Sequence, residues 1–256
     1  MTHASRSSME RWNIAQTHEK YCWDEIVSEE EILSTKDVYK KKVSMIFEML
    51  RKEGKTISPS MKFLQVGCGP FDIINVLPIV ETYSIDPLAD FYKSKFSFDY
   101  KKSNLTAGSG EKLPYPDNYF DVVILANVLD HTYDPEKVLH EIRRVLKPNG
   151  FFYFELHFYQ KSFLILSKVF GAFKKFLTGK IFNPCHPHMF QLFEVKGLLS
   201  RYFSVIHEKI GLDLDHKVHT IEELKAYRKS EKITRSLPAH FGILGIINYL
   251  AFCKKK

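Results

Sequence analysis

The sequence predicts an α/β protein with a Rossmann-like, doubly wound, mostly parallel sheet of seven strands and helices on both faces. From about residue 60, apolar runs of strand length alternate with segments of helical period. The run 62–66 meets a Gly-Cys-Gly turn at 67–69, and the next run ends on Asp86. The run 121–126 is almost wholly apolar, as in a strand buried on both faces. We also expect an N-terminal helical cap and a helical insertion after the fifth strand.

Composition indicates a soluble globular chain of 256 residues, which we interpret as a single domain, 1–256. The net charge of +7 fits phosphate-bearing partners, although the lysines are scattered. Four cysteines stand far apart without a Cys-x-x-Cys pair, which argues against a zinc site and a disulfide framework. Without a secretory h-region or a spanning run, we expect a cytoplasmic protein, with peripheral contact at the inner membrane surface as a further option.

Residues 1–55 are expected to form the helical cap. Residues 1–10 are polar and expected to fray, and 12–27 have a helical pattern rich in aromatic residues. These aromatics either pack as core or cover the glycine turn, and core packing is favoured. A second helix is predicted over 34–52, with a buried face of Val38, Val43, Ile46, Phe47 and Leu50.

Residues 60–157 are expected to form the central part of the sheet. After Asp86 a weak third strand covers 103–107, and the fourth covers 121–126. Asp134 and Pro135 predict a helix start, since one caps and the other fits the first turn. The helix ends at 147–150, and 151–156 is the fifth strand.

Residues 158–190 interrupt this alternation with a basic amphipathic helix. Apolar residues recur at helical spacing between Phe163 and Leu177, and no acid occurs between Gln160 and Pro184. We favour a lid helix that packs over the mouth of the site with solvated lysines. Membrane contact through 161–182 is the alternative.

Residues 191–256 are predicted to hold the last strands and helices. We expect a helix at 191–202, strands at 203–210 and 216–220, and a charged helix at 221–235. The apolar tail 241–253 is too short to span a bilayer. Packing as a terminal helix is favoured over membrane contact through 241–256.

Four stretches between Lys62 and His157 together carry a family resemblance: FLQVGCGP, YSIDP, GEKLPYPDNYFDVVILANVLDHTYDP and EIRRVLKPNGFFYFELH. In combination they resemble a class I S-adenosylmethionine-dependent methyltransferase of the small-molecule methyltransferase-domain type. The resemblance implies S-adenosyl-L-methionine as cofactor. It places Gly67 and Gly69 against the cofactor and Asp86 on both ribose hydroxyls. It places Asn127 either beneath the transferring methyl group or against the methionine end. The full set of cofactor residues it implies is Gln65, Gly67, Cys68, Gly69, Asp86, Pro87, Ser109, Gly110, Glu111 and Asn127.

Three positions depart from the family pattern. Gln65 and Ser109 stand where the family usually has acids, and Phe71 stands at the third loop glycine. Gln65 and Ser109 can still accept hydrogen bonds without charge. We therefore expect weaker or rearranged cofactor contacts rather than loss of binding.

Histidines are the candidates for accepting a proton from the acceptor. His131 lies in the LDHTYDP stretch, and His157 directly follows the predicted fifth strand. His186 and His188 lie in NPCHPHMF, which resembles a segment on the acceptor side of glycan- and natural-product-cluster methyltransferases. We assign His131, His186 and His188 as candidate catalytic residues. The His-x-His pair lacks a nearby third ligand, so no metal is assigned.

These observations predict methyl transfer to an oxygen or nitrogen of a small molecule, such as a sugar, a nucleotide-linked or a lipid-linked glycan intermediate. The alternative is a catalytically silent methyltransferase-like binding or scaffold protein. A dehydrogenase is disfavoured, because GCGPF lacks the Gly-x-Gly-x-x-Gly spacing. Nucleic acid is an unlikely substrate, since 127–130 lacks the signature of base-amino methyltransferases. The sequence leaves the oligomeric state open.

Overall fold

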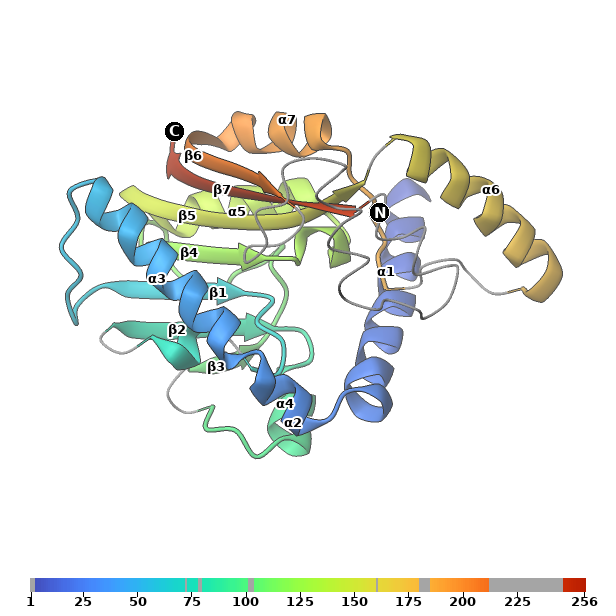
Figure 1. The fold of residues 1–256 in the computed structure, drawn as a ribbon, viewed down its shortest axis with the longest axis horizontal. Coiled ribbons are helices and arrows are strands. Elements are labelled where there is room, and N and C mark those ends of the chain that lie inside the picture. The colour runs from blue at the N-terminus through green and yellow to red at the C-terminus, as the bar shows by residue number, and fades with distance from the viewer. Residues whose placement is uncertain are drawn as a thin grey trace, which may run out of the picture.

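The computed structural model describes residues 3–71, 73–77, 80–100, 104–159, 161–179, 185–211 and 246–256. Its centre is a seven-stranded sheet of order β3-β2-β1-β4-β5-β7-β6 (Figure 1). Only β7 runs antiparallel to its neighbours. The predicted seven-stranded, mostly parallel sheet is therefore confirmed. The strands are β1 (Lys62–Val66), β2 (Glu81–Asp86), β3 (Leu105–Ala107), β4 (Phe120–Ala126), β5 (Leu146–Tyr159), β6 (Phe203–Gly211) and β7 (Ile246–Lys255).

Helices cover both faces of this sheet and bury two apolar cores. Along β4, Val122 and Ile124 join the core beneath α3, whereas Val123 and Leu125 join the core beneath α5 and α7. This alternation follows from the two-residue period of a strand. The α-helices are α1 (His3–Tyr21), α2 (Glu29–Ser34), α3 (Lys36–Lys52), α4 (Ala89–Lys95), α5 (Pro135–Val145), α6 (Lys161–Thr178) and α7 (Leu192–Tyr202).

Local sequence signals account for several of these boundaries. The Asp134 carboxylate accepts a hydrogen bond from the Lys137 N–H at 3.0 Å, and Pro135 opens α5, as predicted. The buried face of α3 matches the prediction, except that Val38 is exposed. Between β1 and β2 the described chain forms only a short 3-10 helix, Ile73–Val76.

The N-terminal helix differs from its prediction in extent and role. α1 already begins at His3 and ends at Tyr21, followed by a π-helical turn over Cys22–Ile26. Trp12 and Trp23 are half-buried and line a cavity. The preference for core packing is met only in part. Trp23 packs against a small apolar cluster that includes Ile32 and Tyr92, whereas Trp12 lies at the cavity because α1 stands beside the carboxyl edge of the sheet rather than on its face (Figure 1).

The C-terminal tail is a strand, so the predicted terminal helix is wrong. β7 inserts between β5 and β6 and pairs with both along its length. Its apolar residues 249–253 are buried in the sheet, since a central strand is covered on both faces. Membrane contact through this part of 241–256 is excluded by that burial. The predicted strand 216–220 and helix 221–235 lie outside the described residues.

The helical insertion after the fifth strand is confirmed as α6, which projects away from the sheet beyond α1 (Figure 1). None of the described residues that line the cavity at the sheet edge comes from α6. The expected packing over the mouth of the site is therefore not observed. Among the described residues, no helix is long and apolar enough to cross a membrane.

Candidate functional site

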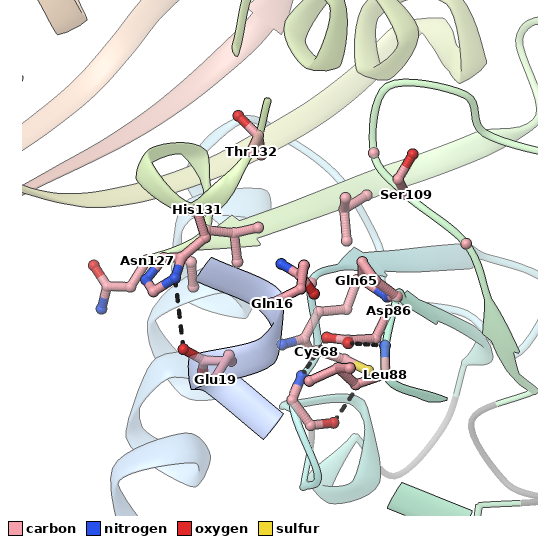
Figure 2. Close-up of a pocket in the computed structure, with 18 of the residues that line it drawn as sticks. Gln16, Glu19, Gln65, Cys68, Asp86, Leu88, Ser109, Asn127, His131 and Thr132 are labelled. Carbon is pink, nitrogen blue, oxygen red and sulfur yellow. Dashed lines mark hydrogen bonds and ion pairs between the residues drawn. The ribbon is translucent and has the colours of Figure 1, made fainter. Parts of the chain in front are cut away.

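A cavity opens at the carboxyl ends of β1, β2 and β4, where the loops of a parallel sheet converge (Figure 2). It encloses about 1040 Å³ of empty space, including its open mouth. The structure brings all ten predicted cofactor residues and His131 to its wall. Residues from α1, the π-helical turn after it and α3 line the cavity as well: Trp12, Gln16, Glu19, Trp23, Tyr39 and Lys42. The sequence analysis offered the two tryptophans as a cover over the glycine turn, but it missed the other four.

The glycine turn after β1 has two glycines in the left-handed region, with φ of 65° at both Gly67 and Gly69. A Cβ on Gly67 would lie 2.4 Å from the Val128 side chain, so this glycine is needed for space as well as for φ. A Cβ on Gly69 would have no neighbour within 4 Å. The turn therefore packs tightly on one side and leaves open space on the other.

Asp86 ends β2 and is buried in the cavity wall. Its Oδ2 accepts from the Gly69 N–H at 3.0 Å, and its Oδ1 accepts from the Leu88 N–H at 2.9 Å. Burial raises the pKa of Asp86 to about 6, and the two backbone hydrogen bonds only partly oppose this. Each carboxylate oxygen keeps a free lone pair, so the pair can accept hydrogen bonds from two adjacent hydroxyls. This geometry fits a ribose diol.

The departures at Gln65 and Phe71 have structural roles. Gln65 is buried, and its Oε1 accepts a hydrogen bond from the Ile73 N–H at 2.8 Å, which orders the chain after the glycine turn. Phe71 stacks on Tyr39 with ring centroids 5.9 Å apart. It does not adopt a positive φ. The loop thus replaces the third glycine with an aromatic contact to α3.

Glu111 is buried in the wall and turned toward the following loop. Its Oε1 accepts from the Tyr133 N–H at 2.8 Å and from the Asp134 N–H at 3.3 Å. Burial raises the pKa of Glu111, although hydrogen bonds from these two N–H groups and from Ser109 act in the opposite direction. Glu111 therefore positions the start of α5, while Ser109 and Gly110 remain on the cavity wall.

Asn127 follows β4 in the left-handed region, with φ of 55°. Its N–H donates to the Glu155 carbonyl at 2.8 Å, which ties it to β5. Its side-chain Oδ1 is buried and has no hydrogen-bond partner among the described residues. A buried acceptor without a partner is costly, so Asn127 is suited to receive a donor from a ligand.

The cap places Glu19 of α1 opposite His131 (Figure 2). Glu19 Oε2 lies 3.7 Å from His131 Nδ1, and Glu19 Oε1 accepts from the Trp23 indole N–H at 3.0 Å. Sequence patterns gave no signal for this pairing, because residues 19 and 131 meet only through tertiary packing.

His131 belongs to a histidine–carboxylate cluster with Asp130 and His186, and only His131 of the three lines the cavity. The His131 and His186 rings are 4.4 Å apart between centroids, and His186 Nδ1 lies 2.7 Å from Asp130 Oδ2. Burial alone would raise the pKa of Asp130, but the hydrogen bond to His186 and the nearby His131 hold it below its usual range. The structure thus brings together two of the three candidate catalytic histidines.

His188 and His157 occupy different positions. The His188 backbone N–H donates to the Asp130 carbonyl at 3.1 Å, and its ring stacks on Phe190. Burial lowers the pKa of both His188 and His157. Within the described chain, neither residue lines the cavity, and His186 does not line it either.

Comparisons with known proteins match the part of the chain that forms the central strands. Residues 64–154 match a family model described as "Methyltransferase domain". The chain is 32% identical over 111 residues to an uncharacterised methyltransferase of Schizosaccharomyces pombe, covering 38% of this chain and 40% of the relative. It is 36% identical over 78 residues to the ubiquinone/menaquinone biosynthesis C-methyltransferase UbiE of Edwardsiella ictaluri, covering 30% of this chain and 31% of the relative. The alignments thus span less than half of each of these relatives.

A solved structure shares the fold across most of the chain. The YcgJ protein from Bacillus subtilis superposes with a TM-score of 0.52 at 18% identity, covering 81% of this chain and 96% of that one. The sheet order and the cavity at its carboxyl edge define a Rossmann-like protein of the nucleotide-binding type. The family match over 64–154 covers β1 to most of β5, and it supports a class I S-adenosylmethionine-dependent methyltransferase.

Proposed function

We propose that this protein transfers a methyl group from S-adenosyl-L-methionine to an oxygen or nitrogen of a small-molecule acceptor. The observation that carries the proposal is the buried Asp86 carboxylate at the end of β2, held by the Gly69 and Leu88 N–H groups beside open space. When bound, the cofactor supplies an electrophilic sulfonium methyl group. Asp86 would accept both ribose hydroxyls, and Gly69 leaves room for the cofactor to approach the backbone.

The remaining wall residues orient the reactants and exclude water. Trp12 and Trp23 of the cap close one side of the cavity, which favours transfer by desolvation and alignment. Asn127 offers its buried Oδ1 at the end of β4. In this proposal Gln65 and Glu111 act mainly by fixing the two loops that surround the cofactor.

Transfer to oxygen or nitrogen releases a proton, and the histidine–carboxylate cluster can receive it. His131 lines the cavity, with Glu19 on one side and His186 on the other. Asp130 holds His186 in one orientation through Nδ1. We assign His131 as the proton acceptor, His186 as its partner in the cluster, and His188 as a positioning residue for Asp130.

The proposed acceptor is a phosphate-bearing or lipid-linked molecule, such as a sugar or glycan intermediate. Support comes from the net charge of +7 and from α6, whose apolar side chains are exposed. Ile165, Val169, Phe173 and Phe176 recur at spacings of four, four and three, so they share one side of the helix. Lys161 and Lys168 are exposed at the edge of this side, and Lys174 is exposed on the opposite side of the helix. In this proposal α6 contacts an anionic membrane surface while the cavity receives the acceptor.

Calorimetric titration of the purified chain with S-adenosylmethionine tests the cofactor part. We expect saturable binding, lost in Asp86→Ala and strongly weakened in Gly67→Ala, where the new Cβ would clash with Val128. Gly54→Ala is the matched control: its φ is also positive at 73°, but nothing lies within 4 Å of the added Cβ. That variant should bind normally.

The titration also discriminates the alternative. Absence of binding to the folded wild-type chain would contradict the proposal and favour a silent scaffold, which the comparisons do not support. If binding is found, labelled cofactor and a panel of lipid-linked glycans, nucleotide sugars and isoprenoid quinols would identify the acceptor. Transfer only to the quinols, at carbon, would retain the enzyme and overturn the oxygen or nitrogen assignment.

A further inference from the structure

A second cluster of chemically reactive side chains lies beside the cap, outside the cavity wall. His18 and Cys22 are four residues apart at the end of α1, and Cys185 begins the segment 185–190. His18 Nδ1 lies 3.0 Å from Cys185 Sγ and 3.4 Å from Cys22 Sγ. All three side chains are half-buried, and none of them lines the cofactor cavity.

The donor set and its spacing suit a borderline-soft divalent metal. Two sulfurs and one imidazole nitrogen are typical zinc ligands. With zinc bonds of about 2.0–2.3 Å, neighbouring donors in a tetrahedral site stand about 3.5 Å apart. The three ligand atoms here all lie within 4.8 Å of one another, so small side-chain rotations would complete the geometry.

We propose that His18 Nδ1, Cys22 Sγ and Cys185 Sγ form a zinc site, with water as the fourth ligand. Binding releases one proton from each thiol to solvent, so a Zn²⁺ ion with two thiolates is neutral overall. Arg11 lies close enough to Cys185 to favour its thiolate.

The proposed site would connect the cap to the segment that carries His186. Another contact already joins these regions, because Arg11 donates to the His186 carbonyl at 3.2 Å. A bound zinc would add a strong link between α1 and residue 185, next to the histidine–carboxylate cluster. This structural role is independent of methyl transfer, so it stands or falls separately from the proposed function.

Metal analysis of the full chain tests the site. We expect about one zinc per chain after dialysis against trace zinc, and a thiolate-to-cobalt charge-transfer band when the metal-free chain is titrated with Co²⁺. Cys22→Ser, Cys185→Ser and His18→Ala should each lose tight zinc binding, and the two serine variants should weaken the band. Cys253→Ala is the control, because Cys253 is a buried thiol in β7, far from the cluster in the sheet.

Hydrogen exchange supplies a second readout. Zinc should slow amide exchange in the last turns of α1 in the wild type, and it should not change the exchange rates of Cys185→Ser. Circular dichroism would confirm that each variant folds. Absence of zinc in the wild type, equal zinc in the serine variants, or a Cys22–Cys185 disulfide that holds no metal would each overturn the proposal.

Discussion

Asp86 combines a binding role with a cost to stability. It is buried at the end of β2 with only backbone N–H partners in the described structure, so its charge is poorly solvated. Burial raises its pKa from the ordinary 3.8 to about 6. A residue selected only for stability would not keep an ionisable group there. The cost is consistent with a carboxylate kept for a ligand.

The Asp86 pKa predicts a pH dependence of stability. Because the folded pKa lies above the unfolded one, the protonated carboxyl favours folding below about pH 4, and this contribution is lost as the pH rises through 6. A shift of this size corresponds to about 3 kcal/mol. Relative to Asp86→Asn, the free energy of unfolding of the cofactor-free wild type should fall by about 2 kcal/mol between pH 4.5 and 7.5, because the unfolded carboxyl is already mostly ionised at pH 4.5. Urea denaturation of both proteins at several pH values measures this difference. The same pH dependence of the unfolding free energy in the wild type and in Asp86→Asn would contradict the prediction.

Single residues also show where sequence reasoning reached its limit. Gln65 and Phe71 were interpreted as departures that weaken cofactor contacts. The structure gives each a packing or hydrogen-bonding role, through Ile73 and Tyr39 respectively. Those partners lie on other elements or beyond the turn. Comparing Gln65 and Phe71 with the family motif therefore does not reveal these contacts.

At the scale of elements, a buried ion pair joins α3 to β5 beneath the cavity. Lys42 Nζ lies 2.8 Å from Glu155 Oε2, and both side chains are almost wholly buried. Tyr153 and Asn248 also donate to the Glu155 carboxylate, at 3.1 and 2.9 Å. The pair thus connects the cap with the two central strands β5 and β7. Each partner would be an unpaired buried charge without the other.

Breaking this pair should destabilise the fold more than breaking an exposed one. Lys42→Met leaves the buried Glu155 without its cation, so we expect a loss of about 3–5 kcal/mol in unfolding free energy. Combining it with Glu155→Gln should recover most of the loss. Lys40→Met on the same helix removes an exposed pair with Asp37 and should cost less than about 1 kcal/mol. Equal effects of Lys42→Met and Lys40→Met in chemical denaturation would refute this.

On the scale of the whole molecule, exposed apolar residues concentrate on α6. This helix projects from the body, whereas the remaining large apolar surface residues are dispersed over other elements (Figure 1). Phe176 is 86% exposed. Exposed apolar side chains beside lysines are typical of helices that lie in a membrane interface. The cavity and α6 would then serve different parts of one lipid-linked acceptor.

Vesicle sedimentation tests this arrangement. The wild type should sediment with anionic vesicles, less with zwitterionic ones, and less at high salt, because the lysine contribution is screened. Phe173→Ser with Phe176→Ser should abolish sedimentation. Lys168→Glu with Lys174→Glu should weaken it by at least about 2 kcal/mol, roughly 30-fold. Phe193→Ser, which alters an exposed phenylalanine of α7, is the control. Equal sedimentation of the α6 and α7 variants would argue against an α6 membrane surface.

The class of fold, the glycine turn, Asp86 and the family resemblance could be predicted from the sequence, because these depend on local periodicity and on motifs within one stretch of chain. The sequence placed the insertion helix and the cap of α5 for the same reason. It misassigned the tail, since the apolar run 246–253 fits a short helix or a buried strand until its neighbours β5 and β6 are known.

The contacts between side chains that are distant in the sequence could not be predicted, because they depend on tertiary packing. This packing set Glu19 of the cap opposite His131, joined His186 to Asp130, and gathered His18 with two cysteines that the sequence analysis had counted as isolated. His18 and Cys185 are 167 positions apart, yet their ligand atoms lie 3.0 Å from each other. Such contacts arise from how helices and loops pack at the edge of the sheet. No spacing rule along the chain encodes them.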